Sequence, residues 1–200
     1  MARISIDARP AALSRGTGIG NYTYQLIQFL SQSKFEHEYF LLWPDDGTPT
    51  LPLPANFRYH PMTRKRREEA VQLPKWLRAQ NIDLHHAPDN GLHAFSGHAT
   101  RLVVTIHDLI PFVMPETVRR GYKQNFLEQV PKVAKEAEII ITVSQVGKRD
   151  IATILDIPED KIHVIHPAPE AIFTPGNARE AKNRLHAYHN IKAPYILYSG

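Results

Sequence analysis

The sequence alternates short apolar runs with longer stretches of helical periodicity, and this alternation restricts the possible folds more than any other feature. The run LVVTI spans Leu102 to Ile106 and the run IIITV spans Ile139 to Val143; both are apolar at nearly every position. Strands that are apolar on both faces are typical of a parallel sheet covered by helices on both sides. We therefore predict an α/β fold, with a Rossmann-like parallel sheet flanked by helices.

Seven segments have the length and composition of strands, and helices with readable apolar faces lie between them. The predicted strands are Arg3–Ala8, Tyr39–Trp43, Phe57–His60, Asp83–Ala87, Leu102–Ile106, Ile139–Val143 and His163–Ile165. The predicted buried faces are Tyr22, Leu26, Phe29 and Leu30 in one helix, Leu73, Trp76 and Leu77 in a second, Tyr122, Phe126, Val130, Val133 and Ala137 in a third, and Ile151, Ile154 and Leu155 in a fourth. Ser144 is placed to cap the fourth helix.

The proline-rich segment 167–176 predicts a linker after the sheet. A helix with Ala181, Leu185 and Tyr188 on one face follows, and then the strand-like run YILYS at 195–199. We assign residues 1–172 to an N-terminal Rossmann-like domain and residues 173–200 to a hinge and the incomplete start of a second domain. The chain is therefore expected to be the front part of a longer protein.

The composition excludes several classes of function. The chain has no cysteine, which excludes disulfides, thiolate nucleophiles and cysteine-based metal sites. We see no secretion signal and no apolar run of the ~18 residues that span a bilayer, so we predict a cytoplasmic protein. The net charge of +4 indicates attraction to phosphorylated substrates or acidic membrane surfaces. The basic run from Arg64 to Arg67 is too short for a nucleic-acid surface; it predicts a solvated helix start or, alternatively, a contact with anionic lipid head groups at the inner face of the membrane.

The stretch GTGIGNYTYQL places three glycines directly before a helix. It does not match the dinucleotide-binding pattern, because Asn21 stands at the third glycine position after Gly16 and Gly18. One interpretation is that Gly18 and Gly20 let the backbone at a helix N-terminus approach an anion or hydroxyl. The other is a plain loop that needs positive φ angles.

His107 and Asp108 directly follow the buried strand 102–106 and therefore lie at its carboxyl end, where ligands bind in open α/β sheets. The glycine stretch and Ser144 belong to the same edge, so three segments converge there. We predict that His107 donates a hydrogen bond to a substrate hydroxyl or takes part in proton transfer, with structural capping as the alternative. Asp108 is expected to orient or cap the loop.

The histidines raise the possibility of a metal site, since their imidazoles and Asp108 could converge at strand ends. The candidates are His85, His86, His93, His98 and His107. Their spacing matches no known ligand pattern, and we predict no metal.

Five motifs in sequence order resemble the N-terminal half of family 4 retaining glycosyltransferases, which have the two-domain GT-B fold. The motifs are GTGIGNYTYQL, VVTIHDLIPFVMPE, ITVSQVGKRDI, KIHVIHPAPEAIFTP and APYILYSG. Two positions depart from the family pattern: Gly147 replaces a frequent serine, and 168–170 replaces the usual Gly-Val-Asp of the hinge.

The resemblance implies transfer of a sugar from a GDP- or UDP-sugar to a glycan or lipid-linked acceptor, with the anomeric configuration retained. His107 would contact the transferred sugar and help to stabilise the transition state. Gly18, Gly20, Asn21, Asp108 and Ser144 would contact donor or acceptor, and no metal or other cofactor is expected.

The family's paired glutamates and basic phosphate-binding residues belong to the second domain, so residues 1–200 alone are expected to be inactive. The TIHDLIP segment favours a mannosyltransferase-like enzyme of bacterial glycan or polysaccharide assembly. Two alternatives stay open: a non-catalytic sugar- or nucleotide-binding α/β module, and an NAD-dependent oxidoreductase or epimerase that acts on nucleotide sugars.

Overall fold

The computed structural model of the chain describes residues 1–49, 51–63, 65–94, 100–170, 172–192 and 194–196. The chain divides into two compact units, Met1–Pro167 and Ala168–Gly200. The assignment of 1–172 and 173–200 to two domains stays a prediction.

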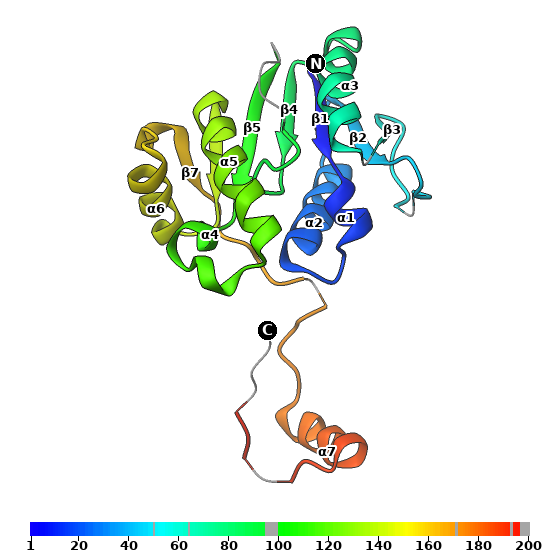
Figure 1. The fold of residues 1–200 in the computed structure, drawn as a ribbon. Helices are drawn as coiled ribbons and strands as arrows, with labels where there is room; N and C mark the ends of the chain where they lie inside the picture. Colours follow the sequence, from blue (N-terminus) through cyan, green and yellow to red (C-terminus); the bar gives the residue numbers. More distant parts are fainter. Residues whose placement is uncertain (50, 64, 95–99, 171, 193, 197–200) are drawn as a thin grey trace. The chain divides into compact units, whose positions relative to one another are not determined.

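The first unit contains a seven-stranded sheet in which every neighbouring pair of strands is parallel (Figure 1). The strands are β1 (Arg3–Asp7), β2 (Glu38–Pro44), β3 (Phe57–Met62), β4 (Leu84–Ala87), β5 (Arg101–Ile106), β6 (Ile139–Thr142) and β7 (Ile162–Val164). Their order across the sheet is β3-β2-β1-β4-β5-β6-β7. All seven predicted strands are confirmed, as is the predicted Rossmann-like α/β fold.

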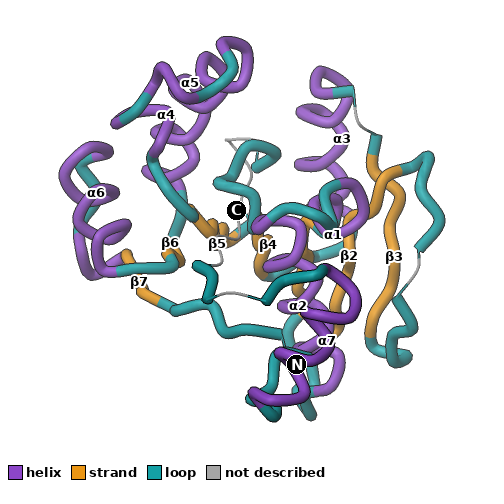
Figure 2. The backbone as a smooth tube through the Cα atoms, turned by 90° about the horizontal axis from the view of Figure 1, so that it is seen from below, coloured by secondary structure: helices purple, strands orange, loops and turns teal. Residues whose placement is uncertain are grey.

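Helices cover both faces of this sheet, as the apolar strands require. They are α1 (Arg9–Leu13), α2 (Gly18–Gln32), α3 (Arg66–Ala79), α4 (Ile110–Val113), α5 (Arg120–Glu136) and α6 (Gln145–Leu155), with short 3₁₀ turns η1 (Pro115–Thr117) and η2 (Glu159–Lys161). In Figure 2, α2 lies on one side of the strands, and α3 and α5 lie on the other. In β2, Leu41 packs into the cluster that contains Ile27 of α2, and Leu42 packs into the cluster that contains Leu73 of α3.

Three of the predicted core residues are on the solvent side of their helices. Phe29 is 67% exposed because it lies two positions from the buried Ile27, about 200° around the helix. Ile154 is also exposed, since α6 buries only a narrow stripe through Ile151 and Leu155. Tyr122 is exposed at the first turn of α5, where its ring lies against that of the buried Phe126. The other residues predicted for these faces are buried or half-buried.

The second unit contains α7 (Ala178–His189), which Asn177 caps by accepting hydrogen bonds from the backbone N–H groups of Arg179 and Glu180. No residue of α7 is buried, and Tyr188 on its predicted apolar face is 77% exposed. In the predicted strand 195–199, residues 197–199 lie outside the described residues, and Tyr195 and Ile196 have no strand structure. Within the described part of the chain, no helix has both the length and the apolar composition to cross a membrane.

Candidate functional site

The carboxyl ends of all seven strands meet at one edge of the sheet, because the strands are parallel. At this edge, β1 leads through α1 into the glycine stretch, β4 leads into the turn Pro88–Gly91, and β5 leads into His107. Since β1, β4 and β5 are adjacent in the sheet, the segments that follow them are brought together.

His107 is held by the turn that follows β4. Its Nε2 lies 2.9 Å from the carbonyl oxygen of Pro88, and its backbone N–H donates to Oδ1 of Asn90 at 2.7 Å. Because a carbonyl oxygen only accepts hydrogen bonds, Nε2 carries the proton. Burial lowers the pKa of His107, although the hydrogen bond to Pro88 opposes this effect. The imidazole is therefore neutral at pH 7, and Nδ1 remains as an acceptor.

The ring of His107 also contacts α2, through Tyr22. The two rings meet edge to face, with centroids 4.9 Å apart and an interplanar angle of 88°. The hydroxyl of Tyr22 lies 3.3 Å from Oγ1 of Thr105, and Nε2 of His86 lies 2.9 Å from the same oxygen. Burial lowers the pKa of His86 to about 4. These four residues, the His107 cluster, join α2, β4 and β5 through one ring contact and two hydrogen bonds to Thr105.

Gly18 and Gly20 of the glycine stretch have different surroundings. A Cβ on Gly20 would lie 1.8 Å from the carbonyl oxygen of Ser14, so close packing of the loop on the helix requires glycine there. Gly18 is exposed at the first position of α2, with open space where a Cβ would stand. Neither Gly16, Gly18 nor Gly20 has a positive φ, so the interpretation as a plain positive-φ loop is wrong.

Asn21 lies in the first turn of α2, where its backbone N–H donates to the carbonyl oxygen of Thr17. Its side-chain Oδ1 is buried and has no hydrogen-bond partner among the described residues. Thr17 caps the helix, since its Oγ1 accepts from the N–H of Gly20 at 3.1 Å. A contact of Asn21 or of the glycines with a substrate stays a prediction.

Asp108 and Ser144 both accept a hydrogen bond from a backbone N–H in the first turn of a helix. Oδ1 of Asp108 accepts from the N–H of Ile110, the first residue of α4, at 2.9 Å. Ser144 is the N-cap of α6, and its Oγ accepts from the N–H of Gly147 at 2.9 Å, which confirms the predicted cap. At Gly147, a Cβ would lie 2.6 Å from Oγ1 of Thr142, so a serine at this position would require that side chain to shift.

Charged side chains gather on the other face of the sheet, beyond the end of β1. Arg9 donates to both carboxylate oxygens of Asp7, at 2.8 and 2.6 Å, and forms an ion pair with Glu69 of α3 at 2.5 Å. All three side chains are buried. Burial works to raise the pKa of Asp7, but the charge and hydrogen bonds of Arg9 lower it to about 2. The guanidinium of Arg9 thus forms ion pairs with two buried carboxylates.

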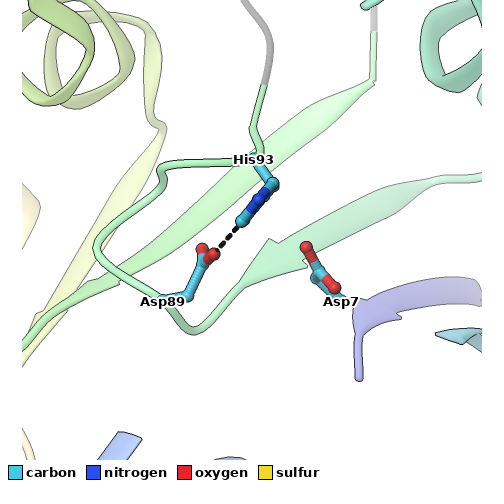
Figure 3. A group of neighbouring side chains, drawn as sticks. All are labelled: Asp7, Asp89 and His93. Atoms are coloured by element: carbon cyan, nitrogen blue, oxygen red, sulfur yellow. Dashed lines mark hydrogen bonds and ion pairs between the residues drawn. The ribbon is translucent and has the colours of Figure 1, made fainter. Parts of the chain in front are cut away.

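A third buried carboxylate, Asp89, lies next to this group and pairs with His93 (Figure 3). Oδ2 of Asp89 is 2.5 Å from Nδ1 of His93, whereas Oδ1 is buried without a hydrogen-bond partner among the described residues. Burial alone lowers the pKa of His93, but the hydrogen bond and charge of Asp89 outweigh it and raise this pKa to about 9. We call Asp7, Arg9, Glu69, Asp89 and His93 the carboxylate cluster.

Among the residues that the structure describes, Asp7, Asp89 and His93 are placed to hold a metal ion, since one ligand atom from each lies within 4.8 Å of the others. However, Oδ1 of Asp7 accepts two hydrogen bonds, from the backbone N–H and Nε of Arg9, and Oδ2 accepts one from Nη2. The guanidinium also places a positive charge beside any cation. A proton on His93 fits this cluster better than a divalent metal. The expectation of no metal stays a prediction, and His98, another candidate, lies outside the described residues.

Several residues of this edge were not found by sequence reasoning. Tyr22 was assigned only to a buried helix face, and Asp89 and Asn90 were not singled out. A signal for the last two was present, since Pro88–Gly91 reads Pro-Asp-Asn-Gly, a turn sequence, directly after the predicted strand 83–87. The same edge rule that selected His107 would have selected this turn.

Comparison with known protein families identifies the family of this chain. The model of Glycosyltransferase Family 4 matches residues 16–168, more than half of the sequence. The chain belongs to this family. No curated protein matches the sequence at a significant level.

Solved structures show the same fold at low sequence identity. Anabaena Alr3699/HepE, in complex with UDP and glucose, has a TM-score of 0.55 and 14% identity, over 92% of this chain and 50% of that one. Apo UGT2 of Phytolacca americana has a TM-score of 0.54 and 15% identity, over 92% and 55%. Sucrose-phosphate synthase of Thermosynechococcus elongatus has a TM-score of 0.53 and 10% identity, over 85% and 91%. The family 4 chain thus spans about half the length of two of these structures.

Proposed function

We propose that this family 4 chain is the acceptor-side part of a glycosyltransferase that moves a sugar from a nucleotide sugar to an acceptor. Membership of the family supports the reaction class, and the complex of Alr3699/HepE with UDP and glucose supports a nucleotide-sugar donor. We further propose retention of configuration, a UDP- or GDP-sugar (with mannose as the sugar to test first) and a glycan or lipid-linked acceptor. Most of the nucleotide would be held by a second domain, without a metal or other cofactor.

The environment of His107 is the single observation that carries a role for this residue. A neutral imidazole whose Nε2–H is committed to Pro88 offers Nδ1 as an acceptor at the ligand-binding edge of the sheet. We therefore propose that Nδ1 accepts a hydrogen bond from a hydroxyl of the transferred sugar. This differs from the donation expected from the sequence. His107 would orient the sugar in the transition state and would not supply a positive charge.

The N-terminus of α2 is proposed to face the negatively charged group of the donor or acceptor. The first N–H groups of a helix have no intrahelical partner and carry a partial positive charge. Gly18 is exposed there, and a side chain at this position would stand between the backbone and a ligand. Backbone dipoles of this kind stabilise a leaving diphosphate without a metal ion.

A lipid-linked acceptor would bring the protein to the inner face of the membrane, and we propose a peripheral contact there. The segment after His107 has the chemistry for it, with Val113 and Met114 about half exposed. Arg119 and Arg120 follow and are also exposed. Apolar side chains beside basic ones favour the surface of an anionic bilayer. Arg64 of the basic run lies outside the described residues.

The test is made on the protein as its own cells produce it, after its intact mass has been measured. Release of UDP or GDP from candidate donors is followed for the wild type and for His107→Ala. We expect the variant to lose about 10- to 100-fold in kcat/KM, as for the loss of one hydrogen bond made in the transition state. His163→Ala changes an exposed histidine on β7 and should retain full activity.

Equal activity of His107→Ala and the wild type would contradict the catalytic role of this site. Together with sugar or nucleotide binding by the unmodified chain, that result would support the non-catalytic module instead.

A further inference from the structure

The turn Pro88–Gly91 contacts His107 at two points. The carbonyl oxygen of Pro88 accepts from Nε2, and Oδ1 of Asn90 accepts from the backbone N–H. The first contact fixes the ring and its tautomer, and the second fixes the backbone. The orientation of His107 therefore depends on where this turn lies.

The turn has an uncommon backbone conformation. Asn90 and Gly91 both lie in the left-handed region, with φ of 62° and 71°. The N–H of Asn90 donates to the carbonyl oxygen of Thr105 at 3.0 Å. A Cβ on Gly91 would lie 2.7 Å from Cγ1 of Val133, so the turn is also packed tightly against α5. Asn and Gly adopt left-handed conformations more readily than other residues, so the sequence favours the shape of the turn, whereas tertiary contacts fix where the turn lies.

Asp89 lies between the two residues that contact His107. Its side chain is directed toward His93, as Figure 3 shows, and forms the 2.5 Å contact with Nδ1. The residue is 6% exposed. Without His93, its carboxylate would be buried near that of Asp7, since ligand atoms of both lie within 4.8 Å. A buried carboxylate that loses its partner is unfavourable, so Asp89 either takes up a proton or moves toward water. In both cases the contact that anchors the turn at His93 is lost.

We propose that Asp89 and His93 form a positioning pair, which anchors the turn Pro88–Gly91 and thereby holds His107 with its Nε2–H on Pro88 and its Nδ1 toward the substrate. This inference rests on the proposed function for its consequence in catalysis. Its physical content, a link from His93 through Asp89 to the tautomer of His107, does not depend on which sugar is transferred. Neither Asp89 nor His93 contacts substrate in this scheme.

The experiment reads the tautomer directly, by long-range ¹H–¹⁵N correlation spectra of the histidine rings in the 200-residue chain, without donor or acceptor. In the wild type we expect His107 as the Nε2–H tautomer. His93→Leu removes the N–H donor to Asp89 and should raise the Nδ1–H tautomer of His107 about fivefold, which corresponds to the loss of one hydrogen bond of about 1 kcal/mol. His93→Asn places an amide N–H near the position of Nδ1 and should restore the wild-type spectrum.

Two controls separate this effect from a general loss of structure. Asp83→Asn weakens the side-chain contact to the backbone N–H of Arg3, just before β4 and at the opposite end from the turn, and should leave the His107 signals unchanged. His93 is partly exposed, so its variants are expected to fold, and their thermal unfolding is recorded alongside.

An unchanged His107 tautomer in folded His93→Leu would overturn the inference, as would equal spectra of the Leu and Asn variants. Activity of His107→Ala equal to that of the wild type would overturn the proposed function while leaving the spectroscopic result intact. The two failures are therefore distinguishable.

Discussion

Burial and charge assign different protonation states to three histidines of one sheet edge. Burial lowers the pKa values of His86 and His107, which have only uncharged hydrogen-bond partners. His93 has a carboxylate partner, and its pKa rises to about 9. At pH 7 the edge therefore carries two neutral imidazoles on the side of α2 and one imidazolium within the carboxylate cluster. Only the neutral rings have a nitrogen that accepts a hydrogen bond.

This difference predicts how the stability of the chain depends on pH. The pKa of His93 is raised from 6.5 to about 9 by Asp89, with Asp7 adding to the effect and Arg9 opposing it. The stabilisation is therefore fully present below pH 6.5 and is lost as the pH rises through about 9. We expect the free energy of unfolding of the wild type to exceed that of His93→Leu by about 1 kcal/mol at pH 6, a value typical of partly exposed ion pairs. At pH 10 the difference should be much smaller. Urea unfolding at the two pH values measures this, and a constant difference would contradict it.

The site residues that the sequence could predict are those whose roles follow from position in a strand. His107 was predicted because it follows an apolar strand, and Ser144 because capping residues precede helices. Asp89 and His93 could not be assigned this way. Their pairing depends on burial and on Asp7 and Arg9, which are about eighty residues away in the sequence. The sequence also could not show that Nε2 of His107 is already bonded.

At the scale of elements, β5 and β6 were predictable because apolar side chains on both faces leave a segment few alternatives to a central strand. The other five strands were predictable from their length and their alternation with helical segments. Helix faces were harder to predict. The buried stripe of α2 is made of Gly20, Thr23 and Ile27, and two of these three are not strongly apolar. Small side chains let α2 lie close to its neighbours, so an apolarity pattern points to the larger residues beside the true contact.

The two glycines of α2 give a matched pair of substitutions. Gly20→Ala places a methyl group 1.8 Å from the carbonyl oxygen of Ser14, so the loop or the helix must shift. We expect a loss of about 3 kcal/mol in the free energy of unfolding, at the upper end of overpacking effects. Gly18→Ala meets nothing within 4 Å and should be neutral or stabilise by up to about 1 kcal/mol. Urea unfolding of both variants tests this, and equal stabilities would contradict it.

At the scale of the whole molecule, the chain consists of two units that differ in how they bury their residues. Met1–Pro167 contains the sheet and the three apolar clusters around it. Ala168–Gly200 contains α7, none of whose residues is buried. It is also shorter than the roughly 40 residues below which a segment rarely sustains a core of its own.

This contrast predicts the effect of removing the second unit. A chain ending at Pro167 should unfold within about 2 °C of the 200-residue chain, since deletion of exposed residues removes little apolar burial. Limited proteolysis of the 200-residue chain should cut first beyond Pro167 and leave the sheet intact. A drop in Tm of about 5 °C or more would show that Ala168–Gly200 stabilises the sheet. An isolated helix of twelve residues is marginal in water and opens readily to cleavage. Resistance of α7 to protease would therefore also contradict the prediction.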